Sequence, residues 1–134
     1  MIRRSFAAAA LLISAPLLSP ATALAQAAKP TPATAMEVNT YGVMSIATFC
    51  EARAQKIDFN KSLAVALAGQ LHVIYGKHGG LLPGSQDPLP EKQFLNNAGF
   101  MIVGGALKFC PQSVPAAEKA RFEKAAASLK PAKK

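Results

Sequence analysis

Both histidines of the chain lie in one short segment, "HVIYGKHGG" at residues 72–80. Histidine binds metal ions and transfers protons near neutral pH, so this segment is where chemistry is expected first. On a helix, His72 and His78 lie six positions apart, about 240° around the axis, and cannot bind one metal ion together. We therefore interpret His72 as a half-exposed side chain. We expect His78 to cap the C-terminal end of a helix, where a cation interacts favourably with the helix dipole.

The same turn is also the best candidate for a ligand site. It runs into a loop at residues 80–90, "GLLPGSQDPLP", which is rich in glycine and proline. The candidate ligand site consists of His78, Gly79, Gly80 and Asp87. No catalytic residue, cofactor site or metal site is predicted, because the few acidic residues are scattered and no nucleophile lies beside a base and an orienting acid. The sequence therefore favours a protein that is not an enzyme.

Cys50 and Cys110 are the only cysteines of the chain. Two cysteines in a small exported domain most simply form one disulfide, because the compartment is oxidising. A redox pair usually has two residues between its cysteines, and two thiolates without nearby histidines make a poor zinc site. We predict a structural disulfide that closes a loop of about 60 residues and stabilises the fold by about 4 kcal/mol.

Residues 1–25 have the order of a secretory signal peptide. Arg3 and Arg4 precede an apolar run at 6–18, and "ALA" at 23–25 supplies small residues before a cleavage point. The run is shorter than the ~20 residues that span a bilayer, although an uncleaved anchor is the alternative. "RRSF" also matches part of a twin-arginine signal, so the export route stays open. We expect an exported protein, periplasmic or extracellular, with no transmembrane segment after processing.

The net charge of +8 is concentrated toward the C-terminus. Residues 37–113 carry six basic and five acidic side chains, whereas residues 114–134 carry six basic and two acidic ones. A basic tail is typical of a solubilising end, and contact with an anionic membrane surface is the alternative. Nucleic-acid binding is not expected, because "KPAKK" at 130–134 has no interleaved aromatic residues.

Residues 26–39 form a Pro/Ala/Thr leader that is expected to be flexible. A helix is predicted to begin at Asn39 or Thr40, either of which can cap it. An i, i+4, i+7 pattern predicts its buried face. That face consists of Val43, Ala47, Cys50, Ala54 and Ile57. The pattern places Cys50 on the buried side, as a structural disulfide requires.

Two further helices are predicted in the core. The second runs from about residue 61 to 77 and ends at Gly79, which favours a left-handed conformation. Its buried face consists of Leu63, Leu67, Leu71 and Ile74. The third runs from about 91 to 109 and is apolar on almost every side, which indicates a central position. Its small residues are expected to let neighbouring helices approach closely; they are Ala98, Gly99, Gly104, Gly105 and Ala106.

A fourth helix is predicted at the C-terminus, capped by Ser113 with Pro115 in its first turn. Its apolar face is thin, so weak packing is expected; that face consists of Val114, Phe122, Ala125 and Leu129. No segment shows the alternation of a strand. The predicted fold is all-α, a small bundle of three core helices plus a peripheral C-terminal helix, with one disulfide. The domain is expected to span residues 40–113, followed by a basic helix and tail at 114–134.

Four short motifs link the chain to known sequences: Cys50, "HGG" at 78–80, "FMIVGGALKFCP" at 100–111 and "VP" at 114–115. With these motifs, residues 40–115 resemble small exported two-cysteine helical proteins of cyanobacteria, a group with no assigned activity. Some similar proteins carry the label cAMP phosphodiesterase class II. That activity resembles a metallo-β-lactamase-like fold with a His-x-His-x-Asp-His metal cluster, which a chain with two histidines does not contain.

Two functions from different classes are compatible with these features. The first is a non-enzymatic exported helical module that acts by binding or structural contact, with a partner that the sequence does not identify. The second is a phosphodiester hydrolase with His72 or His78 at a metal ion, for which the sequence holds no metal-ligand motif. Metal analysis and a cyclic-nucleotide hydrolysis assay of the mature protein separate the two.

Overall fold

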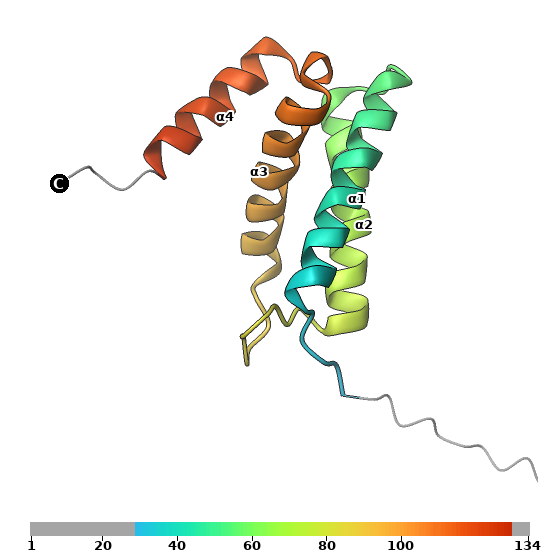
Figure 1. Ribbon diagram of the computed structural model, residues 1–134, viewed down its shortest axis with the longest axis vertical. Helices are drawn as coiled ribbons and strands as arrows, with labels where there is room; N and C mark the ends of the chain where they lie inside the picture. The colour runs from blue at the N-terminus through green and yellow to red at the C-terminus, as the bar shows by residue number, and fades with distance from the viewer. Residues whose placement is uncertain (1–28, 130–134) are drawn as a thin grey trace, which may run out of the picture.

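The computed structural model describes residues 29–129, which fold into four α-helices and one short 3-10 turn (Figure 1). The elements are α1 (Ala35–Ala54), α2 (Phe59–His78), α3 (Glu91–Phe109), η1 (Pro111–Ser113) and α4 (Ala116–Ser128). The first three helices pack against one another, and α4 contacts α3 at the edge of the bundle. The predicted all-α bundle with a peripheral C-terminal helix is confirmed. The predicted signal peptide at residues 1–25 lies outside the described residues.

Helix α1 begins earlier than predicted. The hydroxyl of Thr34 accepts a hydrogen bond from the backbone N–H of Glu37 at 3.2 Å, and the Glu37 carboxylate accepts one from the N–H of Thr34 at 2.9 Å. This reciprocal pair is a capping box, which satisfies two backbone donors at the start of a helix. The prediction of a cap at Asn39 or Thr40 was wrong, and residues 35–39, assigned to the flexible leader, are helical.

The buried face of α1 also differs from the prediction. Its buried residues are Ser45 and Phe49, whereas Cys50 is half-buried. The Phe49 ring meets the edge of Phe59 from α2, with ring centroids 5.5 Å apart. The predicted face lies about one residue further along the helix, a rotation of about 100°. Four of its members are exposed: Val43, Ala47, Ala54 and Ile57.

Helix α2 agrees with its prediction in end point, but three of the four residues of its predicted face are only partly buried, because the buried row is the one at residues 62, 66, 70, 74 and 78. Ile74 is fully buried, and three leucines pack beside the core; they are Leu63, Leu67 and Leu71. The helix ends at Gly79, whose φ of 61° is the left-handed conformation expected there. It begins at Phe59 instead of Lys61, because the Asp58 carboxylate accepts hydrogen bonds from the N–H groups of Asn60 and Lys61.

Helix α3 has the predicted bounds and lies between the α1–α2 pair and α4 (Figure 1). Only one face of it is buried, since Met101 and Phe109 are 66% and 74% exposed. The fourth helix begins at Ala116, so the prediction that Ser113 caps it was wrong. Ser113 lies buried in η1. No residue of α4 is buried, as weak packing requires.

Two glycines of α3 allow close helix contacts, as predicted. A Cβ atom on Gly104 would lie 2.9 Å from the Phe122 ring of α4, and one on Gly105 would lie 2.7 Å from Cγ1 of Ile46 on α1. Both distances are shorter than atoms tolerate without a shift. The Phe122 ring stacks on Phe100, with centroids 4.5 Å apart, which is how α4 docks.

We expect Gly105→Ala to destabilise the fold by about 1 kcal/mol, because overpacking outweighs the better helix propensity of alanine. Gly42→Ala on α1 is the matched control. A Cβ there meets nothing within 4 Å, so this variant is expected to stabilise the protein by about 0.5 kcal/mol or more. Chemical denaturation measures both. Combining Gly105→Ala with Ile46→Ala should show favourable coupling, and purely additive effects would contradict the proposed clash.

The disulfide joins α1 to the residue that follows α3. Cys50 and Cys110 are bonded with their Cα atoms 6.0 Å apart, as predicted. Arg53 reinforces the same end of the bundle. Its Nε donates to the carbonyl of Ser113 at 2.8 Å, and its Nη1 donates to the carbonyl of Ile57 at 2.6 Å. This end of the bundle is therefore held both covalently and by hydrogen bonds.

Candidate functional site

His78 is a core residue. Its side chain is only 3% exposed. Nδ1 lies 3.0 Å from the carbonyl oxygen of Thr31, and Nε2 lies 3.2 Å from the hydroxyl of Tyr41. Because a carbonyl only accepts, Nδ1 donates to it, and Nε2 forms the hydrogen bond with Tyr41. His78 therefore ties the segment before α1 to the end of α2, and the prediction that it caps the C-terminal end of the helix was wrong. His72 is exposed, where a half-exposed side chain was predicted.

An ion pair covers this histidine. Lys77 Nζ lies 2.7 Å from Oε1 of Glu37, which in turn is 3.8 Å from Nε2 of His78. The hydrogen bond from Lys77, followed by those from Thr34, lowers the pKa of Glu37 to about 2. The same pair raises the pKa of Lys77. The pair links α1 to the last turn of α2 at the protein surface.

We expect stability to fall as the pH drops through the acid range. The pKa of Glu37 is about 2 in the folded protein, below its ordinary 4.5, so the stabilisation is present above about pH 4.5. It is lost as the pH falls from about 4.5 toward 2. Glu37→Gln and Lys77→Met should each reduce the loss of melting temperature across that window, measured by circular dichroism. Unchanged pH profiles in both variants would contradict a stabilising ion pair.

The predicted ligand site around the glycine turn is closely packed. A Cβ on Gly79 would lie 2.9 Å from Pro30, and one on Gly80 would lie 2.9 Å from the Tyr75 ring. Asp87 is exposed on the loop. The structure brings His78, Gly79 and Gly80 together at one turn, but none of the four predicted residues lines the groove described next. Ligand binding at this turn stays a prediction.

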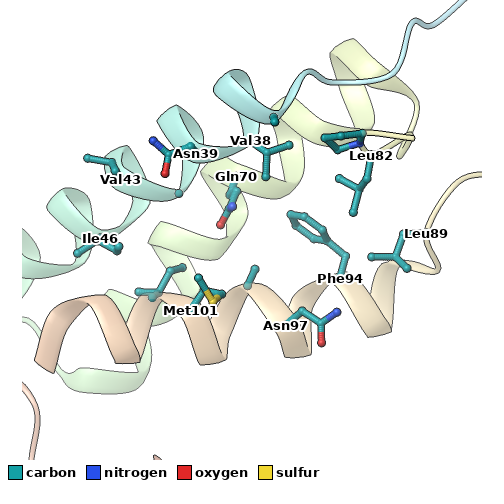
Figure 2. Close-up of a pocket in the computed structure, with 15 residues that line it drawn as sticks. Val38, Asn39, Val43, Ile46, Gln70, Leu82, Leu89, Phe94, Asn97 and Met101 are labelled. Carbon is teal, nitrogen blue, oxygen red and sulfur yellow. The ribbon is translucent and has the colours of Figure 1, made fainter. Parts of the chain in front are cut away.

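A groove of about 460 Å³ lies between α1 and α3 (Figure 2). Val38 and Ile46 of α1 form one wall, Phe94 and Met101 of α3 form the other, and Gln70 of α2 lies at its floor. The loop after α2 closes one end, where Leu82, Pro83 and Leu89 contribute. The hydroxyl of Tyr75 donates a hydrogen bond to the carbonyl of Leu89 and holds this loop in place. The loop at residues 80–90 therefore borders this groove through its apolar residues, and Asp87 does not take part.

Gln70 is the polar side chain inside this groove. It is 8% exposed, and its Oε1 has no hydrogen-bond partner among residues 29–129. Figure 2 shows the side chain reaching from α2 into the space between α1 and α3. Such an unpaired buried carbonyl costs about 1–3 kcal/mol, so its position calls for an explanation. The other polar side chains of the lining, Asn39 and Asn97, are exposed.

Gln70 belongs to a row of α2 that the sequence prediction did not identify as buried. Residues 62, 66, 70, 74 and 78 form one i, i+4 row on α2, and the structure buries all five. Ser62 hydrogen-bonds to the carbonyl of Asp58, and His78 has the partners described above. Gln70 is the member of that row whose side-chain oxygen has none. Because three of these five residues are polar, apolar spacing in the sequence does not indicate that the row is buried.

We expect Gln70→Leu to raise the free energy of unfolding by about 1 kcal/mol, because it replaces an unpaired buried carbonyl with an apolar group of similar size. Gln93→Leu on the exposed side of α3 is the matched control and should change stability by less than about 0.5 kcal/mol. Urea denaturation of the two variants measures the difference. A destabilised Gln70→Leu would mean that the side chain has an essential structural partner.

Gly42 leaves room along the α1 wall of the groove. It lines the groove, and a Cβ atom at this position would meet no atom of the described residues within 4 Å, apart from its own stretch of helix. Gly69 of α2 has equally open surroundings but does not line the groove. The two glycines therefore form a matched pair, in which only a larger side chain at Gly42 would enter the groove.

Two of the three basic residues of α4 have acidic partners within the helix. Arg121 lies 3.0 Å from Glu118, and Lys119 lies 3.9 Å from Glu123. Contact of the C-terminal segment with an anionic surface stays a prediction. Within residues 29–129, no helix has the length and apolar character to cross a membrane. That same stretch contains no cluster of three or more His, Cys, Asp or Glu residues suited to holding a metal ion.

These features define a small disulfide-bridged helical domain with an apolar groove. The chain belongs to the family described as Domain of unknown function (DUF8650), whose model matches residues 36–134. No curated protein and no solved structure matches the chain. Family membership is thus established without an assigned activity. The resemblance to exported cyanobacterial proteins stays a prediction.

Proposed function

We propose that this protein is an exported, disulfide-stabilised binding module that holds a small apolar molecule in the groove between α1 and α3. The observation that carries this proposal is the buried, unpartnered Oε1 of Gln70 at the floor of that groove. A polar atom kept without a partner in a folded core lowers stability, and such costs are commonly retained where a ligand uses the atom.

The shape and lining of the groove support a small-molecule ligand. Its volume of about 460 Å³ falls within the range of small-molecule pockets, roughly 300–1,000 Å³. Such pockets are mostly apolar and contain a few polar groups that fix orientation. The lining has this composition, with aliphatic and aromatic side chains around one buried amide. Val43 and Met101 extend the apolar surface to the exposed rim.

Export is supported by the order of the N-terminal residues and by the disulfide. A basic start, a short apolar run and small residues at 23–25 are typical of a secretory signal. A disulfide that joins distant parts of a small domain is typical of an oxidising compartment. The periplasm or the cell exterior meets both conditions.

Displacement of the neutral fluorophore N-phenylnaphthylamine tests the proposal. The wild-type protein should enhance its fluorescence on binding. Gly42→Leu places a side chain in the groove and should weaken binding at least about tenfold. Gly69→Leu makes the same change in helix propensity, but its side chain lies outside the groove. This variant should bind the probe like the wild type. Equal binding by both variants would exclude the groove as the site, and absence of binding by the wild type would refute the proposal.

A further inference from the structure

We infer that the ligand of this groove is electrically neutral and donates a hydrogen bond to Oε1 of Gln70. This inference rests on the proposed function and adds the chemical class of the ligand, an uncharged amphiphile with an O–H or N–H group. Two independent features of the groove carry it. They are the identity of the unpaired atom and the absence of charge from the lining.

The unpaired atom determines the type of hydrogen bond. Oε1 of Gln70 is a carbonyl oxygen, which accepts and never donates. No group of the described residues donates to it, and neighbouring side chains cover it, so a ligand bonds to it once the Gln70 amide turns toward the groove. A hydrogen bond formed there lies among apolar side chains, where it is stronger than in water. A ligand that provides an O–H or N–H group therefore gains an interaction that an ether or an alkane cannot make.

The lining determines the charge of the ligand. None of the fifteen residues that line the groove is Asp, Glu, Lys, Arg or His. A carboxylate or ammonium group seated beside Gln70 would therefore lose its hydration without an opposite charge to replace it. Burying an unpaired charge in this way is strongly unfavourable. The ion pair of Glu37 and Lys77 lies outside the lining, and its two members neutralise each other at 2.7 Å.

Three ligands with apolar tails of nearly equal length separate these features. They are decanol, its methyl ether and decanoate, each tested for displacement of N-phenylnaphthylamine at neutral pH. Decanol donates one hydrogen bond, the ether donates none, and decanoate is charged. For the wild-type protein, decanol should displace the probe at least about tenfold better than either of the others.

Gln70→Leu is the variant that identifies the acceptor. In this variant the advantage of decanol over its ether should fall to nearly onefold, while the disadvantage of decanoate should remain. Gln70→Met, which also lacks the carbonyl, should behave in the same way. Gln93→Leu on exposed α3 surface should keep the wild-type preferences.

Each other outcome overturns the inference in a distinct way. Equal displacement by decanol and its ether would show that no donor is recognised. A preference for the ether would show that the amide turns its N–H₂ group toward the ligand. Displacement by decanoate as strong as by decanol would refute neutrality. None of these three outcomes contradicts the proposal that the groove binds a ligand, because that proposal is tested separately by comparing Gly42→Leu with Gly69→Leu.

Discussion

Replacing Cys50 and Cys110 with alanine is expected to lower the free energy of unfolding by about 4 kcal/mol. The bond closes a loop of sequence separation 60, and restricting a loop of that length in the unfolded chain stabilises the native state by about this amount. Small domains have stabilities of about 5–15 kcal/mol, so the loss is a large share of the total. The melting temperature should fall by on the order of 20 °C.

Thermal unfolding followed by circular dichroism measures this effect. Wild-type protein in a reducing agent should approach the melting temperature of the double alanine variant, and the variant itself should not respond to the reducing agent. Labelling of free thiols in protein recovered from its native compartment provides an independent test. Two free thiols there, or a melting temperature insensitive to reduction, would contradict a stabilising disulfide.

The second large effect is expected for His78→Ala, at about 3 kcal/mol of lost stability. The substitution leaves a cavity at a side chain that is 3% exposed, and it removes the histidine partner of the Thr31 carbonyl and one of the partners of the Tyr41 hydroxyl. The segment before α1 should then detach from the end of α2. Faster hydrogen exchange at Ala33, whose N–H is bonded to the Leu81 carbonyl at 3.0 Å, would report this detachment.

His72→Ala is the natural control, because His72 is exposed on the same helix. It should change the free energy of unfolding by less than about 0.5 kcal/mol. Equal effects of the two alanine substitutions in urea denaturation would contradict the buried role of His78. Loss of probe binding in folded His78→Ala, with the groove otherwise intact, would instead support the glycine turn as a ligand site.

The sequence predicted the elements well where apolar spacing and helix breakers agreed. Helix α3 has the predicted bounds because a proline-rich loop precedes it and Pro111 follows it. Gly79 ends α2 because a residue without a side chain adopts the left-handed conformation at little cost. The start of α1 was missed because the Pro/Ala/Thr composition obscured a capping box, Thr34 with Glu37. That box was readable in the sequence.

The faces of the helices were harder to predict where polar residues are buried. Ser45 of α1 is buried in the protein core and interrupts the apolar pattern of the helix. The predicted face was therefore rotated toward Cys50. Gln70 and His78 do the same on α2. The groove could not be predicted from the sequence. It depends on the distance between α1 and α3 and on the position of the loop at 81–90. The periodicity of apolar residues within one helix does not indicate the distance between two helices.

The position of the disulfide has a consequence for ligand size. Cys50 and Cys110 join α1 and α3 at the ends of these helices, whereas the groove involves the opposite halves, up to Ile46 and Ile102. The disulfide can therefore act as a hinge. The ends of α1 and α3 that bear the groove can move apart while the bonded ends stay together. We expect affinity to vary gradually over a homologous series of alcohols instead of falling sharply beyond one chain length. Titration of that series measures how affinity depends on chain length, and so how far α1 and α3 separate at the groove.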